Sequence, residues 1–102
     1  MVDKMKELSH CAKKAVFEEC GIKYGKRKST HNVHHIILKD DVHRGLVDKH
    51  FPVNDRCNLV VLPIDVHKEL HDLITETPAY RNCIESRVWL ANYAFNGELD
   101  LI

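Results

Sequence analysis

Histidine is the residue type that stands out in this chain, with eight copies among 102 residues. It is the commonest metal ligand in proteins, and its side chain has the unperturbed pKa that lies nearest neutral pH. Three short stretches place histidines and one asparagine in a suggestive order along the chain: His34–His35, Asn58 and His67–His71. Each stretch alone is weak evidence for a metal site, but together their side chains could bind one metal ion and take part in catalysis beside it.

The spacing within the stretches decides which side chains can act together. His67 and His71 stand four residues apart, so on a helix they lie on one face and can chelate a single cation. His34 and His35 are neighbours, and neighbours in an ideal strand point to opposite faces, so they cannot both face one metal. One strand histidine and two helix histidines would leave a coordination position open, which is the layout of a catalytic site rather than a closed structural one.

Each of these residues also has a plain structural interpretation. His67 and His71 could be surface histidines that flank the core face of an amphipathic helix, and His34 could satisfy its ring with a backbone group. Asn58 could be an ordinary polar residue at the start of a strand. The core face of that helix is expected to pass through four apolar residues: Val66, Leu70, Leu73 and Ile74.

Hydrophobic periodicity places these stretches on a series of short elements. Apolar residues at three- and four-residue steps predict a helix over 3–20, closed by Gly21. A polar and basic connection over 21–31 leads to a predicted strand over 33–38, which is rich in β-branched residues. Residues 39–56 are expected to form a long loop, and loops of that length in compact domains usually carry function.

A second strand is predicted over 57–62, followed by a helix from about 65 to 74 with Asp65 as its N-cap. Thr77–Pro78 predicts the start of a third helix, which runs to about residue 95. The core stripe of the third helix is expected to comprise Tyr80, Ile84, Val88, Ala91 and Phe95. The sequence therefore predicts an α+β fold in a single domain over residues 1–102.

Taken together, the three stretches resemble the HNH endonucleases, which have the ββα-metal fold. The matching segments read Val-His-His-Ile-Ile from Val33, Cys-Asn-Leu-Val-Val-Leu from Cys57, and His-Lys-Glu-Leu-His from His67. The family pattern is a strand with Asp-His or His-His, an Asn-Leu-apolar strand, and a helix with His-x-x-x-His. The resemblance covers residues 30–74 and implies a two-stranded antiparallel hairpin and a helix, flanked by an N-terminal and a C-terminal helix.

The resemblance also implies a role for each matching residue. His34, His67 and His71 match the metal ligands, and His35 matches the general base that activates the attacking water. Asn58 matches the asparagine that braces the loop and orients the base. The family hydrolyses phosphodiester bonds in DNA and less often in RNA. An imidazole is well suited to take a proton from water near neutral pH, and a metal can neutralise charge on the phosphate.

One divalent metal ion is the cofactor that the resemblance implies. His34 stands where many relatives have aspartate, and three imidazoles favour Zn²⁺, Ni²⁺, Co²⁺ or Mn²⁺ over Mg²⁺. Many relatives bind a separate structural zinc through Cys-x-x-Cys pairs, which this chain lacks. We therefore expect no zinc ribbon, and mostly buried and inert thiols at the four cysteines: Cys11, Cys20, Cys57 and Cys83.

The charges are unevenly distributed, although fifteen basic and fifteen acidic residues give a formal net charge of zero. Residues 1–50 hold eleven of the basic residues and seven of the acidic ones. Composition alone favours a solvated loop for the densest basic stretch, whereas a nuclease would need it to meet phosphates. The candidate substrate-binding residues are Lys23, Lys26, Arg27, Lys28 and Arg44.

Two other functions stay open beside a nuclease acting on DNA or RNA. The ββα metal site could be a structural clip in a non-catalytic module that binds nucleic acid or protein, or the histidines could hold no metal. The sequence shows no apolar run long enough to cross a bilayer and no signal peptide, so we expect a cytoplasmic protein without membrane contact. The resemblance implies a bacterial or phage source, because small stand-alone HNH proteins are common there. A homodimer or a larger phage or host partner is possible.

Overall fold

The computed structural model describes residues 9–24 and 30–102. Its helices and strands, in chain order, are α1 His10–Glu19, β1 His31–His35, α2 Lys39–His43, η1 Arg56–Asn58, β2 Leu59–Pro63, α3 Ile64–Glu76, α4 Pro78–Arg81, α5 Ile84–Phe95 and η2 Leu99–Leu101. The predicted α+β class is confirmed. No helix in the described part of the chain is long and apolar enough to cross a membrane.

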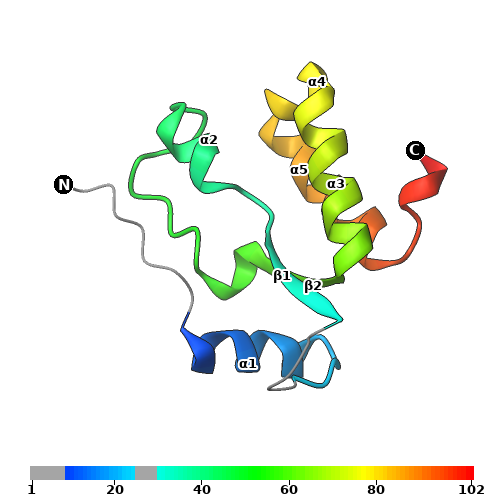
Figure 1. The fold of residues 1–102 in the computed structure, drawn as a ribbon. Coiled ribbons are helices and arrows are strands. Elements are labelled where there is room, and N and C mark those ends of the chain that lie inside the picture. The colour runs from blue at the N-terminus through cyan, green and yellow to red at the C-terminus, as the bar shows by residue number, and fades with distance from the viewer. Residues whose placement is uncertain (1–8, 25–29) are drawn as a thin grey trace.

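The two strands form an antiparallel pair that runs directly into a helix. His35 lies opposite Leu59 and His31 lies opposite Pro63, and α3 begins at Ile64 without any intervening loop. The order strand, strand, helix is therefore realised in the chain. Figure 1 shows α1 on one side of this small sheet and the pair α3 and α5 on the other.

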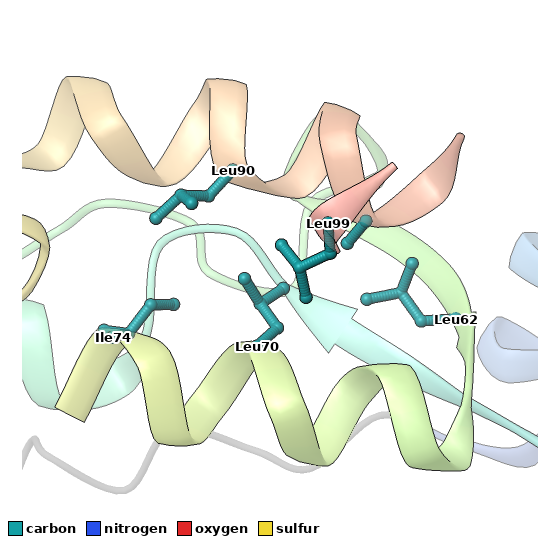
Figure 2. Close-up of a cluster of buried hydrophobic side chains, with 6 residues drawn as sticks. Leu62, Leu70, Ile74, Leu90 and Leu99 are labelled. Atoms are coloured by element: carbon teal, nitrogen blue, oxygen red, sulfur yellow. The ribbon is translucent and has the colours of Figure 1, made fainter. Parts of the chain in front are cut away.

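Alternation along β2 explains why both faces of the sheet are covered. Leu62 belongs to a buried cluster with side chains of α3 and α5, which Figure 2 shows pointing toward one another. Its neighbour Val61 belongs to a second buried cluster, with Val16 and Phe17 of α1. Successive strand residues point to opposite faces, so β2 contributes to two small cores at once.

A buried ion pair links α2 to the C-terminal helices. The Arg87 guanidinium donates to both carboxylate oxygens of Asp41, at 2.6 and 2.8 Å, and both side chains are 1% exposed. The same guanidinium donates to the backbone carbonyls of Tyr80 and Arg81. A bidentate pair of this kind fixes orientation as well as distance, so it holds α2 and α4 against α5.

The prediction of one continuous third helix is wrong. It is divided into α4 and α5 at Asn82–Cys83, where the α4 carbonyls turn to the Arg87 guanidinium. The interruption changes which residues of α5 face the core. Val88 and Phe95, predicted to lie on the core stripe, are about half exposed, and the buried face comprises Ser86, Arg87, Leu90, Ala91 and Ala94.

The other boundaries differ by a few residues. β1 begins at His31, two residues before the predicted strand, and ends at His35, three residues before the predicted end. It ends there because the chain turns to bond Asn58 instead of continuing the ladder. The predicted loop over 39–56 contains α2, and Asp55 accepts from the Cys57 amide to start η1. The N-cap of α3 is Pro63 rather than Asp65.

Helix α1 lies within the predicted helix over 3–20, of which residues 3–8 lie outside the described residues. The cysteines are less buried than predicted. Ser9 is the N-cap of α1, and its side chain accepts from the Ala12 amide. Gly21 follows the helix with a φ of 74°, as expected of the residue that closes a helix. All four cysteines are free. Cys11 and Cys57 are exposed, so the prediction of mostly buried thiols is wrong.

Candidate metal centre

Three histidines converge between β1 and α3. His34 points from the sheet toward α3, where His67 and His71 lie one turn apart. The ring centroid of His34 lies 5.2 Å from that of each helix histidine, and the two helix rings are 4.5 Å apart. One nitrogen from each ring lies within 4.8 Å of the others, which is close enough for a single cation to bind all three.

The cluster is buried at the strand histidine and accessible to solvent at the two helix histidines. His34 is 1% exposed, whereas His67 and His71 are partly exposed. The Nε2 atoms of the two helix histidines face each other at 2.9 Å. A cation bound here would have three protein ligands and a side accessible to water or a phosphate, which is the arrangement of catalytic sites.

His34 has a buried nitrogen that no residue in the described part of the chain satisfies. Its Nδ1 atom has no hydrogen-bond partner among the described residues. A buried polar atom without a partner costs about 1–3 kcal/mol. The unpartnered ring nitrogen is in keeping with a ligand role for His34, and the three-imidazole donor set fits a borderline divalent cation such as Zn²⁺ or Co²⁺.

Burial keeps all three rings neutral at pH 7. Burial, reinforced by the neighbouring histidines, lowers the pKa of His34 from 6.5 to about 2. Burial and the nearby His71 lower the pKa of His67 to about 4. The pKa of His71 is also lowered, first by burial and then by the Arg87 guanidinium. Neutral imidazole is the form that binds metals, so no proton need leave these rings before a cation binds.

His35 is outside the cluster and has a different partner. Its Nε2 atom lies 2.8 Å from the Asn54 side-chain oxygen, to which an N–H at that position donates. The Nδ1 atom of a neutral ring is then left without a proton. Asn54 was not among the predicted site residues, because its sequence context indicates only a turn. Its contact with His35 arises when the loop returns to the end of β1.

Asn58 ties both ends of that loop together. Its Oδ1 accepts from the Ile37 amide at 2.8 Å, and its Nδ2 donates to the carbonyls of Ile37 and Val53, at 3.0 and 2.8 Å. Asn58 is 4% exposed. Its side chain bonds the backbone on each side of the loop, two residues after His35 at one end and next to Asn54 at the other, rather than the imidazole itself.

The structure supports the candidate substrate-binding lysines and arginines less well than it supports the three histidines. Lys26, Arg27 and Lys28 lie outside the described residues, and Lys23 is exposed beyond the end of α1. The Arg44 guanidinium donates to the Arg81 carbonyl at 3.1 Å and to the Asn82 side-chain oxygen, and it lies 4.0 Å from the Asp40 carboxylate. Contact of any of these residues with phosphate stays a prediction.

Comparison with known proteins adds no relative from which a role could be inferred. No protein-family model, curated protein or solved structure matches this chain. The case for a function therefore depends on the geometry of the three histidines and of the residues around them.

Proposed function

We propose that the chain is a metal-dependent endonuclease of the HNH type that hydrolyses phosphodiester bonds in DNA. The observation that carries the proposal is the convergence of His34 on β1 with His67 and His71 on α3, open on one side. Two further features support it: His35 next to the cluster on the strand, and Asn58 bonded across the base of the intervening loop.

His34, His67 and His71 would hold the cation. A divalent cation at this position would act as a Lewis acid, stabilising charge on the phosphate and the leaving oxygen. The helix histidines reach it from adjacent turns of α3, and His34 approaches from the strand. The lowered pKa values of His34 and His67, about 2 and about 4, keep those rings neutral and able to bind throughout the neutral range.

His35 would take the proton from the attacking water. With its Nε2–H donated to Asn54, the unprotonated Nδ1 can accept that proton, and the hydrogen bond fixes the plane of the ring. Asn58 acts one step further away, because it holds the backbone at both ends of the loop that contains Asn54. Both asparagines are positioning residues for the base in this proposal.

Nuclease activity is tested on supercoiled plasmid DNA with purified protein across a panel of divalent metals. The proposal expects nicking or linearisation with at least one transition metal, no cleavage in chelator, and loss of cleavage in His35→Ala. Single-stranded DNA and RNA in the same panel define the substrate. If no metal supports cleavage of any of these polymers, the chain is not a nuclease.

A structural metal clip is the second candidate, and the burial of His34 favours it. A ligand that is 1% exposed contributes to the packing between sheet and helix, so a cation there would also stabilise the fold. The clip predicts that metal raises the melting temperature while the loaded protein cuts no DNA. A nuclease predicts cleavage by the loaded protein and its loss in His35→Ala.

A further inference from the structure

Asn32 lies beside the three histidines but belongs to no part of the pattern described above. It stands two residues before His34 on β1, so both side chains lie on the face of the sheet that α3 covers. The Asn32 side-chain Nδ2 is 3.4 Å from Nδ1 of His67, on the side of the ring away from His71. His67 is thus contacted at both of its nitrogens.

These two contacts favour one position for the proton on His67 when the Asn32 amide nitrogen faces Nδ1. If the Asn32 amide nitrogen donates to Nδ1, that atom carries no proton, and the neutral ring must carry its proton on Nε2. The Nε2–H group can then donate to Nε2 of His71 across the 2.9 Å contact. In that case one directed chain of hydrogen bonds runs from Asn32 through His67 to His71, and the unpartnered Nδ1 atom of His34 lies outside it.

This series of hydrogen bonds is incompatible with metal binding at Nε2 of His67. A protonated Nε2 has no lone pair for a cation, so His67 can bind through this atom only after its proton has moved to Nδ1. An Nδ1–H group then needs an acceptor where Asn32 had offered a donor. A half-turn of the Asn32 amide puts its oxygen at that place, because the two ends of an amide occupy nearly the same volume.

We propose that Asn32 is the positioning residue for His67, donating to Nδ1 in the metal-free protein and accepting from Nδ1–H when a cation is bound. This inference rests on the proposed metal site. The exchange is balanced: one proton leaves Nε2, one is bound at Nδ1, and the ring is neutral before and after. Partners of this kind fix the tautomer of metal-binding histidines and raise their affinity for the metal.

Asparagine can donate to His67 in the metal-free protein and accept from it in the metal-bound protein. Substitutions of Asn32 can test the two roles separately. Asn32→Asp can only accept, so it favours the Nδ1–H tautomer even without metal. Asn32→Leu can do neither and releases His67 to a mixture of tautomers. Asn92, an exposed asparagine on α5, provides the matched controls Asn92→Asp and Asn92→Leu.

The experiment is ¹⁵N NMR of the histidine rings in the full chain, without metal and then with Zn²⁺. In the metal-free protein, we expect a protonated Nε2 on His67 in the wild type, a protonated Nδ1 in Asn32→Asp, and averaged nitrogen shifts in Asn32→Leu. Zn²⁺ should convert wild-type His67 to the Nδ1–H form. The Asn92 variants should match the wild type throughout.

Zn²⁺ affinity, measured by competition with a chelator, supplies the second readout. Loss of such a partner typically weakens metal binding by about 10–100-fold, so Asn32→Leu should bind Zn²⁺ by that factor less tightly than Asn92→Leu. A His67 tautomer that is the same in all Asn32 variants, together with unchanged affinity, overturns the inference and leaves the metal site standing. If the wild type itself binds no Zn²⁺, the metal site fails and the inference with it.

Discussion

Acid should destabilise the metal-free protein through His34 in particular. In the unfolded chain its imidazole titrates near pH 6.5, whereas in the folded protein burial lowers the pKa to about 2. Between those values the unfolded state binds a proton that the folded state excludes. Stability is therefore fully present above pH 6.5 and falls as the pH drops toward 2, which is the sign expected of a histidine buried in its neutral form.

The loss of stability in acid is calculated from the one proton that His34 binds in the unfolded chain but not in the folded protein. Each pH unit in this window costs about 1.4 kcal/mol per excluded proton. Between pH 7 and pH 5, His34 alone should lower the free energy of unfolding by about 2 kcal/mol, because most of that interval lies below pH 6.5. His67 acts in the same direction, with a smaller contribution because its ring is partly exposed.

Urea unfolding at half-unit pH steps, in chelator, measures this slope. His34→Leu cannot titrate at this position, so its free energy of unfolding should fall by about 2 kcal/mol less than that of the wild type between pH 7 and pH 5. Comparing slopes removes any difference in stability at neutral pH. Asn92→Leu is the control for substitution and should keep the wild-type slope. Equal slopes in the wild type and His34→Leu would refute the reasoning.

Three further predictions concern the residues around the cluster. Arg87→Met leaves the Asp41 carboxylate buried without its partner and should cost about 3–5 kcal/mol by urea unfolding, much of which Asp41→Leu in the same chain should restore. His35→Ala should keep its metal and its fold while cleaving plasmid about 10²–10⁴-fold more slowly; a rate equal to the wild type would remove it as the base. Asn54→Ala and Asn58→Ala should both slow cleavage by less than His35→Ala does. Only Asn58→Ala should also lower stability, by about 1–3 kcal/mol for each group left unpaired, and equal melting temperatures for the two variants would contradict this.

Local patterns predicted much of the cluster. Leu70 and Ile74 are buried on the predicted core face of α3, and the four-residue spacing of His67 and His71 places both rings on one side of that helix. Two short β-branched runs predicted the two strands, and the resemblance to the HNH endonucleases implied their antiparallel pairing. These features depend on residues close together in the chain, where helix and strand periods determine which side chains share a face.

The residues that the sequence did not reveal act across long separations. Asn54 meets His35 only because the intervening loop is folded back by Asn58. Arg87 joins Asp41 across 46 residues and interrupts the helix that the apolar spacing predicted to be continuous. No local period reports such contacts, because they depend on how the elements pack rather than on the order of residues within one element.

The central claim, that the three histidines bind one divalent cation, is tested most directly by metal stoichiometry. Wild-type protein, His67→Ala and His71→Ala are each dialysed against the same low free Zn²⁺ concentration, and bound metal is measured together with protein. We predict one Zn²⁺ per chain for the wild type and far less for either variant, with all three proteins folded by circular dichroism. Full stoichiometry in both variants, or no bound Zn²⁺ in the wild type, would contradict the claim.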